Sequence, residues 1–152
     1  MISSEDIKQL RDKTGVSVML CKKALEETGG DMDRAVLVLR KQGMKIAEKK
    51  SERMMKAGAV NCYVHSNKQV GVLIEARSET DFVAKNEGFQ SFVYDIAMHI
   101  AAMDPENNEE LLEQPYIKNQ DMKVKDCLND MIQKFGENIK ISRFIRYSVS
   151  QK

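Results

Sequence analysis

A long apolar stripe in residues 86–103 dictates much of what this chain can form. Five large apolar residues recur there at spacings of three and four, the period of one helix face: Phe89, Phe92, Val93, Ile96 and Ile100. Asn86 can cap the start of this helix, and Asp104, which precedes a proline, should lie beyond its end. Such a face is stable only when other elements cover it.

Strand-like stretches lie on both sides of this helix. Apolar and polar side chains alternate on either side of a polar turn, which predicts a β-hairpin over residues 59–76. Three residues share one side of its first strand: Val60, Cys62 and Val64. Residues 139–149 are rich in β-branched and aromatic side chains, but their apolar phase changes midway. A bulge near Ser142-Arg143 would reconcile the two phases.

A second amphipathic helix is predicted over residues 124–135, closed by Gly136. The resulting order of elements is strand, strand, helix, helix, strand. We therefore predict an α+β fold for residues 59–152, with a small antiparallel sheet and helices packed on one of its faces.

The N-terminal residues predict three short helices. Ser17 and Asp31 provide N-cap oxygens for the second and third helices, and the glycines at 29–30 suit the left-handed end of the second. Gly43 is expected to end the third helix. We predict a three-helix domain of the ubiquitin-associated type over residues 1–46. A domain this small is marginally stable alone, so we expect it to dock on the larger part.

Residues 47–58 join these two parts and are predicted to be a charged linker. The mostly charged stretch that begins at Lys45 could continue the third helix or form a solvated connector, and we favour the connector. Glu48 and Glu52 interrupt its basic residues, and no aromatic side chain is interleaved for stacking on bases. Direct nucleic-acid binding is therefore not expected.

Charge and hydropathy exclude several classes of protein. The 24 Lys and Arg against 23 Asp and Glu give a net charge of +1, which favours neither nucleic acid nor a membrane surface. No apolar run approaches the roughly 18 residues of a membrane span. The first residues have neither the apolar core of a signal peptide nor the Arg-rich character of a transit peptide. We expect a cytoplasmic protein, or the mature form of an organellar one.

No catalytic or metal-binding pattern is present in the sequence. It has no Gly-rich phosphate loop, no nucleophile elbow and no metal-ligand spacing. Cys21, Cys62 and Cys127 are widely spaced in apolar patterns, and we expect them to be reduced and buried. Neither His65 nor His99 completes a zinc site. We predict a binding or regulatory protein without cofactor or metal, rather than an enzyme.

Two local anomalies point to a binding role. The segment Thr80–Asn86 places Asp81 beside Phe82 at a strand-to-helix junction, where both are exposed unless something receives them. Met19, in the second N-terminal helix, shares its face with solvated charged residues. Met19 is either a partly covered residue at a helix start or, with Val18, part of a contact patch.

These features and several short motifs resemble the elongation factor Ts family over nearly the whole chain. The motifs include Cys21–Leu25, Gly29–Asp31, Glu79–Asn86, Ala97–Met103, Leu112–Lys118 and Gly136–Ile139. The resemblance implies a guanine-nucleotide exchange factor of translation elongation, which promotes GDP release from the GTPase elongation factor Tu and binds no nucleotide itself. It also implies a homodimer formed through the core domain.

The resemblance further implies which residues touch the GTPase. Asp81 and Phe82, flanked by Thr80 and Val83, match the residues that wedge against its nucleotide-binding domain and disturb the magnesium and phosphate region. Three helix-tip positions match residues that touch the same domain: Arg11, Val18 and Met19.

The chain departs from the family pattern in three places. Val18 stands where the family often has Met, and Leu20 where it often has Asp. Residues 104–111 stand where short relatives carry a long helical hairpin. A second function therefore stays open, namely a non-catalytic module of the same family that binds the GTPase, or RNA, without driving exchange.

Overall fold

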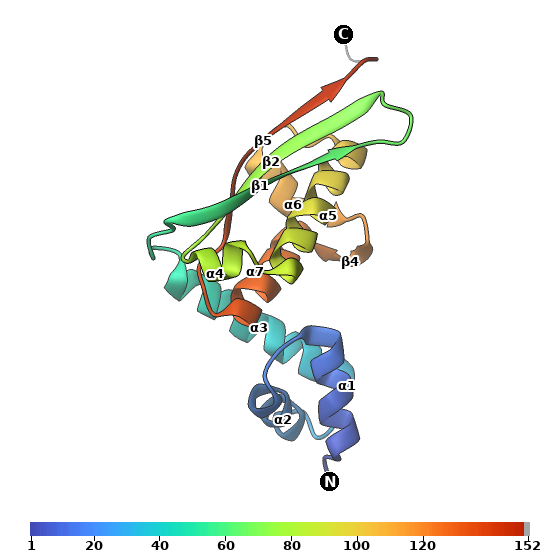
Figure 1. Ribbon diagram of the computed structural model, residues 1–152. Helices are drawn as coiled ribbons and strands as arrows, with labels where there is room; N and C mark the ends of the chain where they lie inside the picture. Colours follow the sequence, from blue (N-terminus) through green and yellow to red (C-terminus); the bar gives the residue numbers. More distant parts are fainter. Residues whose placement is uncertain (151–152) are drawn as a thin grey trace.

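In the computed structural model, which describes residues 1–150, three helices lie at one end of the molecule and an α+β part at the other (Figure 1). The N-terminal helices are α1 (Ser4–Thr14), α2 (Val18–Glu27) and α3 (Met32–Lys50). The strands are β1 (Ala57–Val64), β2 (Val70–Ser78), β3 (Pro115–Tyr116), β4 (Asn119–Lys123) and β5 (Lys140–Ser148). The other helices are α4 (Asp81–Ala84), α5 (Glu87–Met103), α6 (Asn108–Glu113) and α7 (Val124–Phe135). The predicted α+β class is confirmed.

The helices start at the predicted capping residues. The Ser17 hydroxyl accepts the backbone N–H of Leu20 at 3.4 Å, and the Asp31 carboxylate accepts that of Arg34 at 3.0 Å. Asn86 caps α5 in the same way. Each cap satisfies a backbone donor that the first helical turn leaves without a partner.

The third helix does not end at Gly43, as the sequence led us to expect. It continues to Lys50, and Gly43 is buried inside it. A Cβ atom at this position would meet Oε1 of Gln133 on α7 at 2.8 Å. The glycine therefore leaves room for the Gln133 side chain of α7 and does not end the helix. The division of the chain into residues 1–46, 47–58 and 59–152 stays a prediction.

The main sheet has the strand order β1-β2-β5, and both pairs are antiparallel. Glu75 pairs with Arg143 and the next residue, Ala76, with Ile141, so Ser142 is an extra residue in β5. The predicted bulge is therefore confirmed. The Ser142 hydroxyl donates to Oε1 of Glu75 at 2.6 Å, which fixes the bulged residue to β2.

One face of the sheet is covered by α5, which packs on β1 and β2. Every residue of the predicted apolar stripe of α5 is buried, and Phe89, Ile96 and Ile100 are buried completely. Burial of one such side chain stabilises a fold by about 1.5–3 kcal/mol. The stripe therefore forms the centre of the core, together with Ile74 from the sheet and Ile132 from α7.

The N-terminal helices bury a small core of their own. Its members come from all three helices and the loop before α2: Leu10, Val16, Cys21, Leu25 and Leu39. The second half of α3 extends beyond this core and packs against α7. The expected docking of the helical domain on the larger part is thus made by one continuous helix (Figure 1).

Residues 104–123 contain short elements that the apolar pattern does not predict. The Asn107 side chain caps α6 by accepting the N–H of Glu110 at 2.9 Å. β3 and β4 form a two-stranded ribbon, and Nδ1 of the buried His99 accepts the N–H of Ile117 in the turn between them at 3.1 Å. Individual side-chain contacts, rather than periodicity, define these elements.

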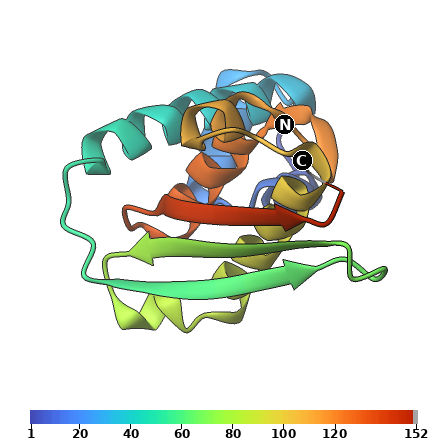
Figure 2. The ribbon, with the colours of Figure 1, turned by 90° about the horizontal axis from the view of Figure 1, so that it is seen from above.

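The three cysteines are free thiols in different environments. Cys21 is buried and Cys127 partly buried, but Cys62 is exposed, so the expectation of a buried thiol is wrong there. The alternation along β1 places Cys62 on the face of the sheet opposite α5. In Figure 2 this face is turned toward the viewer, and no helix or strand within residues 1–150 covers it.

Candidate partner-binding site

A single helical turn holds Asp81 and Phe82 in solvent. Its N-cap is Thr80, whose hydroxyl oxygen accepts the backbone N–H of Val83 at 3.4 Å. Phe82 is 85% exposed, whereas Val83 is 3% exposed and Ala84 is also buried. Because successive helical residues are about 100° apart, one turn can hold two residues out while the next two anchor it. We call Asp81 and Phe82 the α4 patch.

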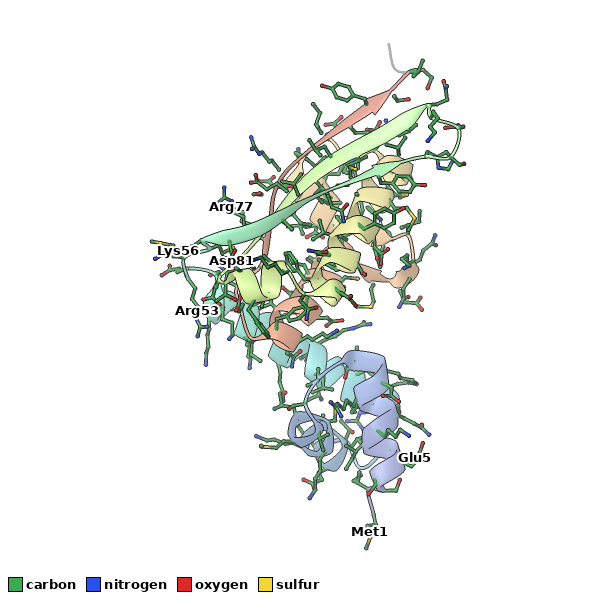
Figure 3. All side chains as sticks on the ribbon, in the orientation of Figure 1. Met1, Glu5, Arg53, Lys56, Arg77 and Asp81 are labelled. Atoms are coloured by element: carbon green, nitrogen blue, oxygen red, sulfur yellow. The ribbon has the colours of Figure 1, made fainter. Side chains whose placement is uncertain are left out.

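The Asp81 carboxylate makes no ion pair with any residue of the described chain, although basic side chains are near it. Figure 3 shows Arg53, Lys56 and Arg77 around this end of the sheet. Arg53 and Arg77 pair with glutamates instead, on β2 or just after it. The α4 patch therefore combines an unpaired negative charge with an exposed aromatic ring.

Arg11, Val18 and Met19 form a second exposed group, which we call the helix-tip patch. Val18 and Met19 lie in the first turn of α2, and Met19 is 78% exposed. Met19 is therefore largely exposed rather than partly covered, and its part in a contact patch stays a prediction. Arg11 and Val18 line one shallow groove of about 330 Å³, together with Ile7. Leu20 instead is partly buried against the helical core.

The two patches lie on different parts of the molecule. The helix-tip patch belongs to the N-terminal helices, and α4 lies at the end of the sheet nearer to them (Figure 1). α3 connects the two parts and packs on α7, and its Lys50 Nζ donates to the carbonyl oxygen of Gly136 at 2.6 Å. A packed helix, rather than a free linker, therefore sets most of the separation between the patches.

The resemblance placed Thr80 and Val83 in the contact segment as well. In the structure these two residues anchor the α4 patch to the rest of the fold. Val83 belongs to the main core. Thr80 Oγ1 donates to Oε2 of Glu137 at 2.7 Å. Direct contact of these two residues with a partner stays a prediction. No role was predicted for Glu137 itself, although it lies in the Gly136–Ile139 motif of the family resemblance and directly follows the glycine that ends α7.

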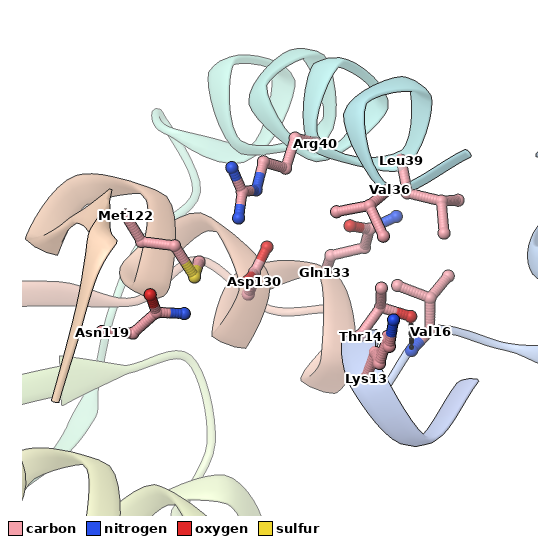
Figure 4. Close-up of a pocket in the computed structure, with 10 residues that line it drawn as sticks. All are labelled: Lys13, Thr14, Val16, Val36, Leu39, Arg40, Asn119, Met122, Asp130 and Gln133. Carbon is pink, nitrogen blue, oxygen red and sulfur yellow. Dashed lines mark hydrogen bonds between the residues drawn. The ribbon is translucent and has the colours of Figure 1, made fainter. Parts of the chain in front are cut away.

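A cavity of about 230 Å³ lies between the helical domain and the α+β part (Figure 4). Arg40 of α3 and Asp130 of α7 both point into it. Burial raises the pKa of Asp130 from 3.8 to about 6, and the nearby Arg40 only partly offsets this effect. No residue of either patch lines the cavity, so we assign it to the docking of the two parts.

Within residues 1–150 no group of three His, Cys, Asp or Glu side chains could hold a metal ion. In the same part of the chain, no helix has both the length and the apolar character needed to cross a bilayer.

Comparisons with known proteins identify the family of this chain. The family described as Elongation factor TS matches residues 79–152. The chain is 40% identical over 196 residues to Elongation factor Ts of Carboxydothermus hydrogenoformans, covering 99% of this chain and 90% of that protein. It is 40% identical over 193 residues to Elongation factor Ts of Thermotoga petrophila, covering 99% of this chain and 97% of that protein.

These matches, with the α+β core, define a translation elongation factor. Within that class, the chain belongs to the elongation factor Ts family. The alignments, over 193 to 196 residues, are longer than the chain's own 152. These relatives therefore carry internal residues that this chain lacks.

Proposed function

We propose that this protein is a guanine-nucleotide exchange factor that promotes GDP release from elongation factor Tu. The observation that carries the proposal is the α4 patch, an exposed Phe beside an unpaired carboxylate on a turn anchored in the core. The helix-tip patch supplies a second contact with the same GTPase. The protein needs no cofactor and no active site of its own for this role.

The exchange follows from linkage between two ligands. If the factor binds GDP-free elongation factor Tu more tightly than the GDP-loaded form, then its binding weakens GDP by the same factor. Burial of one Phe side chain contributes about 1.5–3 kcal/mol. If Phe82 is buried only in the GDP-free complex, that energy weakens GDP binding by roughly 10- to 150-fold. The charge of Asp81, brought toward the phosphates, acts in the same direction.

Release of labelled GDP from elongation factor Tu tests this proposal. The wild-type protein at micromolar concentration should accelerate release, and no acceleration would refute exchange activity. Asp81→Ala with Phe82→Ala should remove most of the stimulation at unchanged thermal stability, since both side chains are exposed. Leu37→Ala is the matched control, because Leu37 is an exposed apolar residue outside both patches.

The same assay separates the alternative function. A shortened member of the family could bind the GTPase, or RNA, without driving exchange. Retention of elongation factor Tu by the immobilised protein, combined with an unchanged rate of GDP release, would select this alternative.

We also infer that two copies pair through the open face of the main sheet. Five exposed apolar residues lie on this face: Val60, Val64, Leu73, Ile145 and Tyr147. Exposed apolar surface of this kind is characteristic of interaction sites, and two sheets pack well face to face. Glu75 and Arg143 on this face already pair with each other, with Oε2 and Nη2 3.3 Å apart. A second copy therefore meets no unpaired charge from this pair.

Sedimentation at several protein concentrations tests the dimer. The wild-type protein should change from monomer to dimer as its concentration rises, and Leu73→Glu should remain a monomer because it places a charge in the paired face. Leu37→Glu introduces the same charge elsewhere and should still dimerise. The exposed Cys62 thiol should react more slowly in the dimer than in the monomer. A wild-type protein that stays monomeric at every concentration would refute the pairing.

A further inference from the structure

Glu137 holds the strand-to-helix junction from which the α4 patch projects. Its Oε1 accepts the backbone N–H groups of Glu79 and Thr80, each at 3.1 Å. Its Oε2 accepts the hydroxyl of Thr80 at 2.7 Å. One carboxylate thus takes three hydrogen bonds from two consecutive residues, and these residues lead directly into α4. We infer that Glu137 is a positioning residue for Asp81 and Phe82, an inference that rests on the proposed exchange function.

The contact is reciprocal, so it fixes both segments. Oε2 of Glu79 accepts the backbone N–H of Asn138 at 3.0 Å. Asn138 is buried, and its Nδ2 donates to the carbonyl oxygens of Ser51 at 3.2 Å and Arg53 at 2.9 Å. The dipeptide Glu137-Asn138 therefore joins the α4 junction to the segment that follows α3.

The local sequence of α4 cannot provide this rigidity alone. A helix of one turn is unstable by itself, because nucleation fixes several residues for very few hydrogen bonds. The Thr80 cap bond to Val83 is long, at 3.4 Å. Hydrogen bonds to a carboxylate are shorter and stronger than those between neutral groups. Glu137 therefore supplies the strongest polar contacts that hold the start of α4.

A fixed orientation of α4 should increase the apparent affinity of the protein for the GTPase. If α4 samples other orientations, only the fraction of molecules with Phe82 correctly placed can engage the GTPase, and the apparent affinity falls by that fraction. Glu137 contributes to function by raising this fraction, without touching the partner.

The experiment uses Glu137→Ala, which removes all three contacts, and Glu137→Gln, which keeps the shape but loses the charge and one acceptor oxygen. We expect Glu137→Ala to slow GDP release about tenfold at sub-saturating factor, equivalent to about 1.4 kcal/mol, and Glu137→Gln to lie between it and the wild type. Glu109→Gln removes the same charge at an exposed position and should keep the wild-type rate. Amide hydrogen exchange at Glu79 and Thr80 should accelerate in Glu137→Ala.

A double-mutant cycle with Asp81→Ala/Phe82→Ala distinguishes positioning from general stabilisation. If Glu137 acts through the α4 patch, then Glu137→Ala should add almost nothing in the background that lacks both side chains. Fully additive losses, or unchanged amide protection in Glu137→Ala, would overturn the inference. A wild-type protein without exchange activity would refute the proposed function instead, and the amide exchange would still report whether Glu137 holds the junction.

Discussion

Replacement of Asp130 by Asn should stabilise this protein at neutral pH. Asp130 lies in the cavity between the helical domain and the α+β part, where burial raises the pKa of its carboxyl from 3.8 to about 6. The native state therefore holds this proton more tightly than the unfolded chain does. This tighter binding of the proton stabilises the native state fully at a pH below 3.8, the ordinary pKa of the carboxyl. The stabilisation is lost as the pH rises through about 6.

The size of the effect follows from the two pKa values. The change from 3.8 to about 6 corresponds to about 3 kcal/mol at neutral pH, taking roughly 1.4 kcal/mol per pKa unit as an upper limit. The neutral amide of Asp130→Asn avoids this cost and keeps the shape of the side chain. For a protein of this size, such a gain raises Tm by roughly 6–12 °C.

Urea unfolding of both proteins across pH provides the assay. The variant should be more stable than the wild type above about pH 6, and the difference should shrink as the pH falls toward the ordinary pKa of Asp. An equal difference at every pH would refute the titration of Asp130 as its cause. A variant less stable than the wild type at neutral pH would show that the attraction of Asp130 to the nearby charge of Arg40 outweighs burial.

Two further predictions concern other parts of the fold. Gly58→Ala should destabilise the protein by about 1–3 kcal/mol in thermal unfolding, because its Cβ would lie 2.5 Å from the backbone oxygen of Ala76. Gly71→Ala, on the same hairpin, meets nothing closer than 3.6 Å and should cost much less, and equal costs would contradict this reasoning. Burial lowers the pKa of His99, whose Nε2 donates to Oε1 of Gln114 at 2.9 Å. The contribution of His99 to stability should therefore fall as the pH drops below about 6.5, opposite in sign to that of Asp130, and His99→Gln should remove this part of the pH dependence.

Much of this fold is encoded locally and could be predicted from the sequence. The caps at Ser17, Asp31 and Asn86 depend on side chains within three residues of the amides they bind. The stripe of α5 and the bulge at Ser142 are visible as periodicity and as a change of phase. These signals need no knowledge of the rest of the chain.

The remaining features depend on partners distant in the sequence. Gly43 is a residue typical of a helix end, and its place inside α3 beside Gln133 of α7 is visible only in the structure. Alternation along β1 shows which residues share a side with Cys62, but only the position of α5 decides which side is open. The exposure of Phe82 could be predicted from its local sequence, whereas its support by Glu137 could not.

The contact between Glu137 and Thr80 also limits when the α4 junction can fold during synthesis of the chain. The two residues are 57 positions apart, and chains are synthesised from the N-terminus. The helical domain can close its core as soon as its own three helices are made. The α4 junction must wait until the residues after α7 emerge, so a chain cut before Glu137 would carry Phe82 without its support. The surface that we propose acts on the GTPase is thus among the last parts of the molecule to form.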